Sequence, residues 1–280
     1  MNLKNKYLMI ILAVIIIKTN FSINVQAKEY NRFNNISIED GLSQATVETM
    51  MQDSKGYIWL GTNDGLDRYN GYTFKKYSYE KGQENSLVNS YILDIKEDSE
   101  GNIWVATAAG ISKIYNDGEK VQNYTSDSES GNLSNDNTTT MLISNSNKIY
   151  VGTAEGINLY DKKTDKFNLI YPELKEEYVN SLAEDKYGNI WAGTENGLYK
   201  INVVTNAIER FESTDDVNTI SENYIYKVYY DGDKHIWVGT YDNGFCKLNI
   251  ENNKVTRYLL TREDGTIRGA FVKNFLMDMH

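Results

Sequence analysis

Residues 53–66 read DSKGYIWLGTNDGL, and this pattern recurs along the chain with its Gly, Ile and aromatic positions in register. Copies read DSEGNIWVATAAGI at 98–111 and DKYGNIWAGTENGL at 185–198, and a looser copy begins at Asp231. A further copy, SNSNKIYVGTAEGI at 144–157, has Tyr150 in place of Trp. The aromatic position advances in steps of 45, 46, 41 and 46 residues. Periods of about 40 to 50 residues are typical of stacked repeat folds such as propellers.

Each copy has the pattern of β-structure. In the first copy, residues 47–51 and 58–62 are β-prone segments on either side of an Asp-x-x-Gly turn. Asn63 to Gly65 is a hairpin signal, and further strands are expected at 66–69 and 73–77. No window shows sustained helical periodicity. The sequence therefore predicts an all-β fold, a β-propeller of four-stranded antiparallel blades, with about five complete blades and the start of a sixth.

The repeat boundaries follow from the recurring pattern. Asp278 lies 47 residues after Asp231 and is expected to begin a sixth Asp-x-x-Gly turn. We therefore expect an incomplete ring, and a five-bladed ring sealed by a strand at 30–38 is the alternative. The third copy lacks the turn Asp and Gly, so its first hairpin is expected to be irregular. The repeats are expected at about 40–84, 85–131, 132–174, 175–217 and 218–265, with a truncated sixth from 266.

The N-terminal segment has the pattern of a targeting signal. A basic start precedes LMIILAVIII at 8–17, an apolar run that Lys18 ends. A membrane-spanning helix needs about 20 apolar residues, so this run fits the shorter apolar region of a secretory signal. Val25 and Ala27 provide the small residues of a cleavage site. We predict a signal peptide at 1–27, with an uncleaved anchor as the alternative, and an extracytoplasmic location for residues 28–280.

The composition excludes several functional classes. The formal net charge is −10, and loss of the three Lys in the first 27 residues would make it −13. Such an acidic chain repels phosphate backbones, so no nucleic-acid partner is expected. The chain has one Cys and two His, which cannot form an internal disulfide or the usual zinc sites. No metal and no cofactor are expected.

The recurring Asp and aromatic residues are interpreted as structural. The Asp residues match no EF-type calcium loop, and an Asp in a tight turn accepts hydrogen bonds from its own backbone. Each second-strand aromatic residue is interpreted as a wedge between neighbouring blades. These structural repeat positions are Asp53, Trp59, Asp98, Trp104, Tyr150, Asp185, Trp191, Asp231 and Trp237.

The search for catalytic residues finds little. Cys246 lies on the third strand of the fifth copy and is expected to be a small buried hydrophobe. His235 lies in the turn of that copy, where we expect it to be exposed and without a partner for general-base catalysis. No Gly-rich phosphate loop or Gly-x-Ser-x-Gly elbow occurs. The sequence predicts no catalytic residue.

Polar loops at one rim of the propeller form the predicted ligand site. The loops between second and third strands, and the lead-ins to the first strands, are expected to meet at the mouth of the propeller. Amides, carboxylates and a Tyr in such a place suit a neutral or cationic polar ligand. Ordinary solvated turn residues are the alternative interpretation. The predicted ligand-binding residues are Asn63, Asp64, Asn89, Glu155, Glu195, Asn196, Asn223, Tyr241, Asp242 and Asn243.

The phrase D-x-x-G-x-I-W-x-G-T-x-x-G-L, with its apolar lead-in (Leu42 to Val47 in the first copy), resembles the two-component regulator propeller repeat. The opening FNNISIEDGLS at 33–43 resembles the strand that introduces the first blade in that family. The resemblance covers residues 30–280. It implies an extracytoplasmic sensor propeller, non-catalytic in itself. A membrane region and a histidine kinase or diguanylate cyclase output would follow beyond residue 280.

The resemblance also implies a class of ligand. In this family a saccharide or another small polar molecule is the expected partner, and a dimer of the full-length protein remains open. Two alternatives stay beside the sensor. One is an exported propeller enzyme such as a polysaccharide lyase, which needs a His or paired carboxylates at the central mouth. The other is a surface platform for protein partners.

Overall fold

The computed structural model describes residues 35–128, 132–258 and 272–275. The chain divides into two compact units, Met1–Asn35 and Ile36–His280, and only Asn35 of the first unit is among the described residues. The predicted signal at 1–27 and most of the predicted sixth repeat therefore lie outside them. Over the described ranges, no helix is long and apolar enough to cross a membrane.

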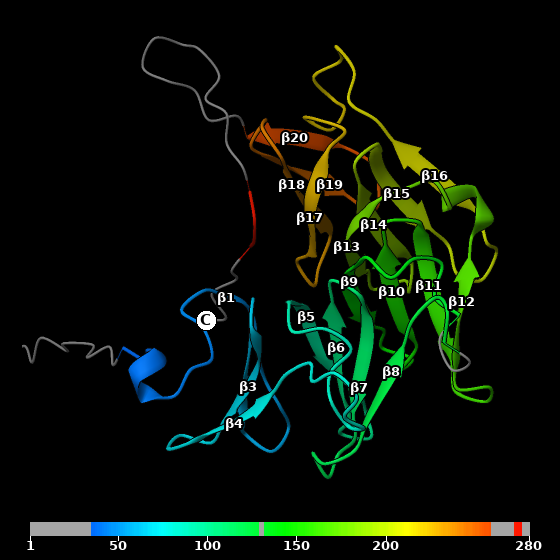
Figure 1. Ribbon diagram of the computed structural model, residues 1–280. Helices are drawn as coiled ribbons and strands as arrows, with labels where there is room; N and C mark the ends of the chain where they lie inside the picture. The colour runs from blue at the N-terminus through cyan, green and yellow to red at the C-terminus, as the bar shows by residue number, and fades with distance from the viewer. Residues whose placement is uncertain (1–34, 129–131, 259–271, 276–280) are drawn as a thin grey trace, which may run out of the picture. The chain divides into compact units, whose positions relative to one another are not determined.

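The described residues form antiparallel sheets of four strands each, and every sheet uses strands that are consecutive in the chain (Figure 1). The first sheet contains β1 (Val47–Gln52), β2 (Ile58–Thr62), β3 (Gly65–Tyr69) and β4 (Phe74–Tyr77). The second contains β5 (Ile92–Glu97), β6 (Ile103–Thr107), β7 (Gly110–Ile114) and β8 (Val121–Tyr124). The third contains β9 (Thr138–Ile143), β10 (Ile149–Thr153), β11 (Gly156–Asp161) and β12 (Lys166–Ile170).

The last two complete sheets repeat this plan. The fourth contains β13 (Val179–Glu184), β14 (Ile190–Thr194), β15 (Gly197–Ile201) and β16 (Ile208–Phe211). The fifth contains β17 (Ile225–Tyr230), β18 (His235–Thr240), β19 (Phe245–Asn249) and β20 (Val255–Tyr258). The predicted all-β fold of four-stranded blades is confirmed.

Short 3₁₀ helices occur at two places in the described chain, η1 (Ile38–Asp40) and η2 (Pro172–Leu174). The sequence suggested a strand at 30–38 as part of the alternative closed ring; residues 30–34 lie outside the described residues, and residues 35–38 contain no strand. Ser37 and Asp40 form a capping box, and Gly41 ends the turn with φ 115°, a conformation that glycine adopts readily. These local hydrogen bonds favour a helical turn over an extended strand.

The first hairpin of each sheet closes with the same turn. In the first sheet the Asp53 N–H donates to the Tyr57 carbonyl at 2.9 Å. In the third sheet the Ser144 N–H donates to the Lys148 carbonyl at 2.9 Å, and Asn147 takes the left-handed position with φ 57°. Asn tolerates this conformation better than most residues. The expected irregularity of the third hairpin is therefore wrong.

The sheets pack through their first strands, each of which contacts the first strand of the next sheet (Figure 1). The second-strand glycine of the repeat permits this approach. A Cβ added at Gly193 would lie 2.5 Å from the side chain of Ile225 in the next sheet. A Cβ at Gly239 would lie 2.8 Å from Val272, whose N–H donates to the Thr240 carbonyl at 3.1 Å. Val272 therefore occupies the first-strand position of a sixth repeat.

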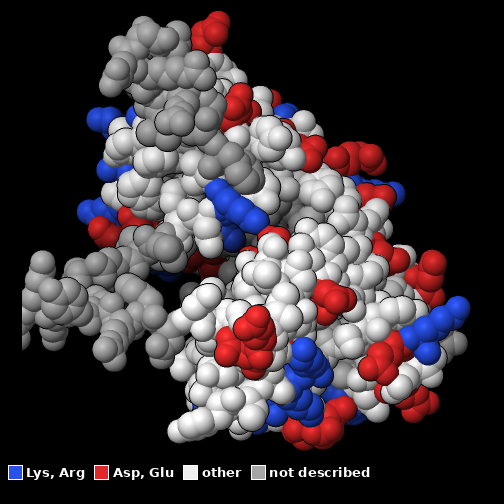
Figure 2. Space-filling view, turned by 60° about the vertical axis from the view of Figure 1, so that its left-hand side comes forward, with Lys and Arg blue, Asp and Glu red and all other residues white. Residues whose placement is uncertain are grey.

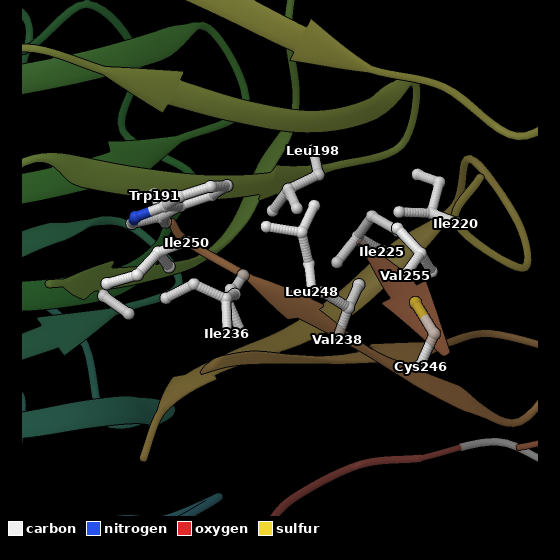
Figure 3. Packing of buried hydrophobic residues seen from close by; sticks show 12 residues of the cluster. Trp191, Leu198, Ile220, Ile225, Ile236, Val238, Cys246, Leu248, Ile250 and Val255 are labelled. Atoms are coloured by element: carbon white, nitrogen blue, oxygen red, sulfur yellow. The ribbon is translucent and has the colours of Figure 1, made fainter. Parts of the chain in front are cut away.

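The hydrophobic core consists of clusters that each join two successive sheets. In the cluster between the fourth and fifth sheets, Trp191 packs with Ile236 and Ile250 (Figure 3). Cys246 belongs to this cluster and is fully buried, as predicted, and burial raises the pKa of its thiol to about 11. Trp59, Trp104, Tyr150 and Trp191 each belong to a cluster between their own sheet and the next, as the wedge interpretation predicts.

The turn Asp does more than cap its turn, because it also binds the Trp wedge. Asp98 accepts hydrogen bonds from the Glu100 and Asn102 N–H groups through Oδ1, both at 2.9 Å. Its Oδ2 accepts a bond from the Trp104 indole Nε1 at 2.8 Å. The same carboxylate–indole bond joins Asp53 to Trp59 at 2.7 Å and Asp185 to Trp191 at 2.8 Å. The repeat therefore couples the first hairpin to the contact between sheets.

The fifth sheet departs from this arrangement and corrects the prediction for His235. The Asp231 carboxylate binds the His235 ring, with 2.9 Å between Oδ2 and Nδ1. The His235 side chain is 28% exposed, so it is partly buried and paired rather than exposed and alone. His235 stands where the second and fourth sheets have Asn102 and Asn189, and its ring binds the Oδ2 atom that the indole binds in those sheets.

Candidate functional site

A cavity of about 680 Å³ lies where the first strands of the sheets meet. The side chains that line it come from the lead-ins and the first two residues of β1, β5, β9, β13 and β17, from the loops after β6 and β14, and from residues 272–275. We call it the central cavity. Its volume lies within the range of small-molecule sites in proteins. Its polar and aromatic lining residues include Glu48, Tyr91, Asn137, Tyr178, Asn180, Glu195, Tyr224, Tyr226, Lys273 and Asn274.

Aromatic rings and a carboxylate gather on one side of the central cavity. Tyr224 stacks on Tyr241 with 4.9 Å between ring centroids and 13° between planes. Burial and the hydrogen bond from its hydroxyl to Glu195 raise the pKa of Tyr224 to about 12. A tyrosine phenol is protonated at neutral pH, so Tyr224 presents its hydroxyl donor to Glu195. This side offers flat apolar faces next to a carboxylate.

An ion pair occupies another side of the central cavity. The Lys273 Nζ lies 2.7 Å from the Glu48 Oε2, so the start of the sixth repeat contacts the first sheet. The hydrogen bond to Glu48 raises the pKa of Lys273. Charged groups of both signs therefore line this part of the site.

Amide groups supply further hydrogen-bonding positions. The Asn137 Nδ2 donates to the Tyr178 hydroxyl at 3.2 Å, which joins the third sheet to the fourth. The side chains of Asn180 and Asn274 also line the central cavity. Tyrosine faces with amides and carboxylates at their edges can bind a small polar molecule by stacking and hydrogen bonding.

Of the predicted rim residues, Glu195 lines the central cavity, and Tyr241 packs on its wall. Asn89 and Asn223 instead bind the backbone of their own loops. Their Oδ1 atoms accept bonds from the Tyr91 N–H at 2.8 Å and the Ser213 N–H at 2.6 Å. The structure therefore brings part of the predicted set to the cavity and leaves these two amides as loop supports.

The other predicted rim residues lie in the loops between second and third strands. Asn63 and Asp64 are exposed. The Glu155 carboxylate accepts a bond from the Asn135 Nδ2 at 3.0 Å, and the Asn196 Nδ2 donates to Glu177 at 3.1 Å. Backbone N–H groups of Asp242 and Asn243 donate to one oxygen of Glu222, at 2.9 and 3.2 Å. A ligand-binding role for these residues stays a prediction.

The cavity residues that the sequence analysis missed lie on the lead-ins and first strands. Glu48 and Tyr226 are the second residues of β1 and β17, and Lys273 takes the equivalent place after Val272. Tyr91, Tyr178 and Tyr224 each directly precede a first strand. Alignment of the first strands would have grouped them. Their spacing within one repeat carries no sign that they meet, because they come from several different repeats.

The structure offers no metal centre in its described part. Within residues 35–128, 132–258 and 272–275, no group of three or more His, Cys, Asp or Glu side chains is arranged to hold a metal ion. On the face in Figure 2, Lys and Arg side chains lie interspersed with Asp and Glu among broad uncharged areas. The features of the candidate site that can bind a ligand are its aromatic and polar lining residues.

Comparisons with known proteins identify the repeat. Residues 41–64, 86–109, 173–196 and 219–242 match the family described as two component regulator propeller, which confirms the resemblance. A curated relative, histidine kinase P4 of Formosa agariphila, is 39% identical over 64 residues, 22% of this chain and 5% of the relative.

Solved structures share the fold. The extracellular domains of two putative hybrid two component systems from B. thetaiotaomicron match with TM-scores of 0.53 and 0.54 at 20% and 21% identity. The matches cover 88% and 89% of this chain and 39% and 37% of those chains. A streptogramin B lyase matches with a TM-score of 0.58 at 15% identity, over 82% of this chain and 78% of the lyase. The chain thus spans well under half the length of the two-component relatives that it matches.

Proposed function

Because the chain carries repeats of the two component regulator propeller, we propose that it is the extracytoplasmic ligand-sensing propeller of a two-component-type signalling protein, non-catalytic in itself. The observation that carries the proposal is the central cavity, where Tyr rings, amides and carboxylates from successive sheets face one volume. The likeness to extracellular domains of hybrid two component systems supports the location and the role.

The proposed ligand is a small polar molecule with a face that stacks on tyrosine, and a saccharide fits this description. Tyr224 and Tyr241 supply the stacking surface, and Glu195 supplies the acceptor beside it. Binding would link first strands of different sheets, so the ligand would stabilise the contacts between them. This stabilisation of the contacts between sheets would carry the signal of ligand binding to a membrane and output region.

A ligand screen tests the proposal. Purified chain is titrated with a panel of mono- and oligosaccharides and small polar metabolites, and binding is measured by calorimetry. Tyr224→Ala should weaken a bound ligand at least about ten-fold, since a stacking surface is lost. Tyr72→Ala is the matched control, because Tyr72 is 90% exposed and does not line the central cavity. Equal affinity in both variants would overturn the assignment of the cavity.

The exported enzyme is the second candidate, and the likeness of its fold to streptogramin B lyase is the observation that favours it. Glu195 and Glu48 are the cavity carboxylates that could act as acid and base. Turnover of a polysaccharide that is lost in Glu195→Gln would establish the enzyme. Saturable binding without turnover would support the sensor.

A further inference from the structure

The Trp of the repeat has the same neighbours in the first, second, fourth and fifth sheets. One is the cation directly opposite on the third strand, and another is an aromatic ring on the fourth strand. The cation–ring pairs are Arg68–Trp59 at 5.6 Å, Lys113–Trp104 at 4.9 Å, Lys200–Trp191 at 5.4 Å and Lys247–Trp237 at 5.7 Å. The ring–ring pairs are Trp59–Tyr77 at 5.5 Å, Trp104–Tyr124 at 5.7 Å, Trp191–Phe211 at 5.6 Å and Trp237–Tyr258 at 6.0 Å.

The third sheet replaces this whole set. Tyr150 stands for the Trp, and Leu159 lies opposite it where the other sheets have Arg or Lys. Ile170, paired with Ile157, takes the place of the fourth-strand ring, and Ser144 takes the place of the turn Asp. Each substitute is smaller than the residue it replaces, and the third copy lies outside the segments that match the family. The third sheet therefore differs from the other sheets at all of these positions together.

The smaller side chains leave a groove on the side of the third sheet that faces the fourth sheet. It has a volume of about 450 Å³, and its lining includes Tyr150, Leu159, Ile170, Tyr171 and Val203. We call it the third-sheet groove. Tyr150 is 3% exposed and belongs to the core cluster between these sheets, and the other four side chains pack against that cluster. Lys148, Glu173 and Asn206 line it as well, so the groove combines apolar side chains with polar and charged groups.

The wall of the third-sheet groove is held in an uncommon conformation. Tyr171 has φ 57° and ψ 72°, in the left-handed region. All other non-glycine residues with positive φ in the described ranges are Asn or Asp, which tolerate this region. Such a conformation in a bulky residue costs free energy and persists only where the surroundings enforce it, often at ligand sites. This backbone conformation therefore lies at the groove, where Tyr171 and the preceding Ile170 both contribute to the lining.

We propose that the third-sheet groove binds a small molecule that carries a flat aromatic ring. The ring would lie against the partly buried Leu159, Ile170 and Tyr171 side chains, above the buried Tyr150. It would fill the volume that a cation stem and an aromatic ring fill in the other sheets. A planar ring is as thick as the Tyr or Phe ring that the other sheets have at the position of Ile170, and it stacks favourably on tyrosine. This site is separate from the central cavity and shares no lining residue with it.

Indole serves as the probe, and saturation-transfer NMR and calorimetry on the whole chain measure its binding. We expect a dissociation constant on the order of 0.1–1 mM, as for a fragment of this size. Ile170→Tyr restores the ring of the other sheets and should weaken indole binding at least about ten-fold. Phe211→Tyr is the matched control, because it changes the same position of the fourth sheet and leaves the groove intact.

Two results would overturn the proposal. One is indole binding that is absent, or that Ile170→Tyr leaves unchanged. The other is equal binding of cyclohexanol, which would show that any apolar molecule of this size fits. If Ile170→Tyr melts below the parent chain, Leu159→Lys replaces it, since this variant restores the cation of the other sheets. Loss of indole binding in either folded variant, with binding kept in Phe211→Tyr, supports the aromatic site.

Discussion

The second and fifth sheets have the same repeat pattern and differ in what covers their Trp. Trp104 is completely buried, and its carboxylate, cation and ring partners are all present. Trp237 is partly exposed, and Asp231 binds His235 rather than the indole. The third sheet covers Trp104, whereas the described neighbour of Trp237 in the next repeat is Phe275, at 6.2 Å. One sequence motif therefore contributes differently to stability according to the sheet that follows it.

Truncation of the Trp should show the largest difference. Trp104→Ala removes a fully buried side chain and should lower the free energy of unfolding by about 3–5 kcal/mol. Trp237→Ala removes a side chain that water already reaches, and we expect a loss of less than about 2 kcal/mol. Urea denaturation of both variants measures the two values. Equal losses would show that the fifth Trp is covered as well as the second.

Removal of the turn carboxylate should have the next largest effect. Asp98→Ala leaves the buried Trp104 indole N–H and the Asn102 amide without an acceptor. An unsatisfied buried donor costs about 1–3 kcal/mol, so the loss should fall in this range. Asp231→Ala frees donors that lie nearer to water and should cost less. A larger loss for Asp231→Ala, measured by thermal unfolding, would contradict the difference between the sheets.

The cation over the Trp ring should contribute a smaller amount. Lys113 is 8% exposed and lies 4.9 Å from the Trp104 ring. Lys113→Met keeps the stem and removes the charge, and a desolvated cation–π contact is worth about 0.5–2 kcal/mol. Lys247→Met, at the same position of the fifth sheet, should cost about 0.5 kcal/mol or less. The two melting curves provide the comparison.

The pH dependence of the fifth sheet should be the smallest effect. Burial alone would raise the pKa of Asp231, but hydrogen bonds from the His235 backbone and ring and from the Asp233 and Lys234 N–H groups lower it. A carboxylate with a lowered pKa stabilises the fold above its unfolded pKa, and this stabilisation is lost as the pH falls through the folded value. The melting temperatures of the parent and Asp231→Asn should therefore converge in acid. A constant difference would exclude the charged pair.

Much of the fold could be predicted because its signals are local. Gly56 and Asp53 define a turn within four residues, and the Trp59 phrase defines the strand that follows. Repetition of this unit predicts the stacking of sheets, since one sheet cannot bury both faces alone. Residues 35–38, the described end of the strand suggested at 30–38, are not extended, because the Ser37–Asp40 capping box is also local and favours a helical turn over residues 38–40.

The candidate site was predicted only in part. Glu195 and Tyr241 were placed at the mouth, and the structure puts them at or beside the central cavity. Tyr178, Tyr224 and the Glu48–Lys273 pair were missed. These residues belong to repeats about 45 or more positions apart, and no spacing within a repeat shows that they face one volume.

The sequence by itself determined the sheet, its four strands, its turns and the period at which it recurs. Those features depend on backbone hydrogen bonds and side-chain patterns that span a few residues. Only the tertiary structure decided which polar residues meet at the central cavity, which Trp is covered, and that His235 replaces an indole as the partner of Asp231. These outcomes depend on how neighbouring sheets pack, because burial and pairing are set by side chains that a whole repeat separates in the chain.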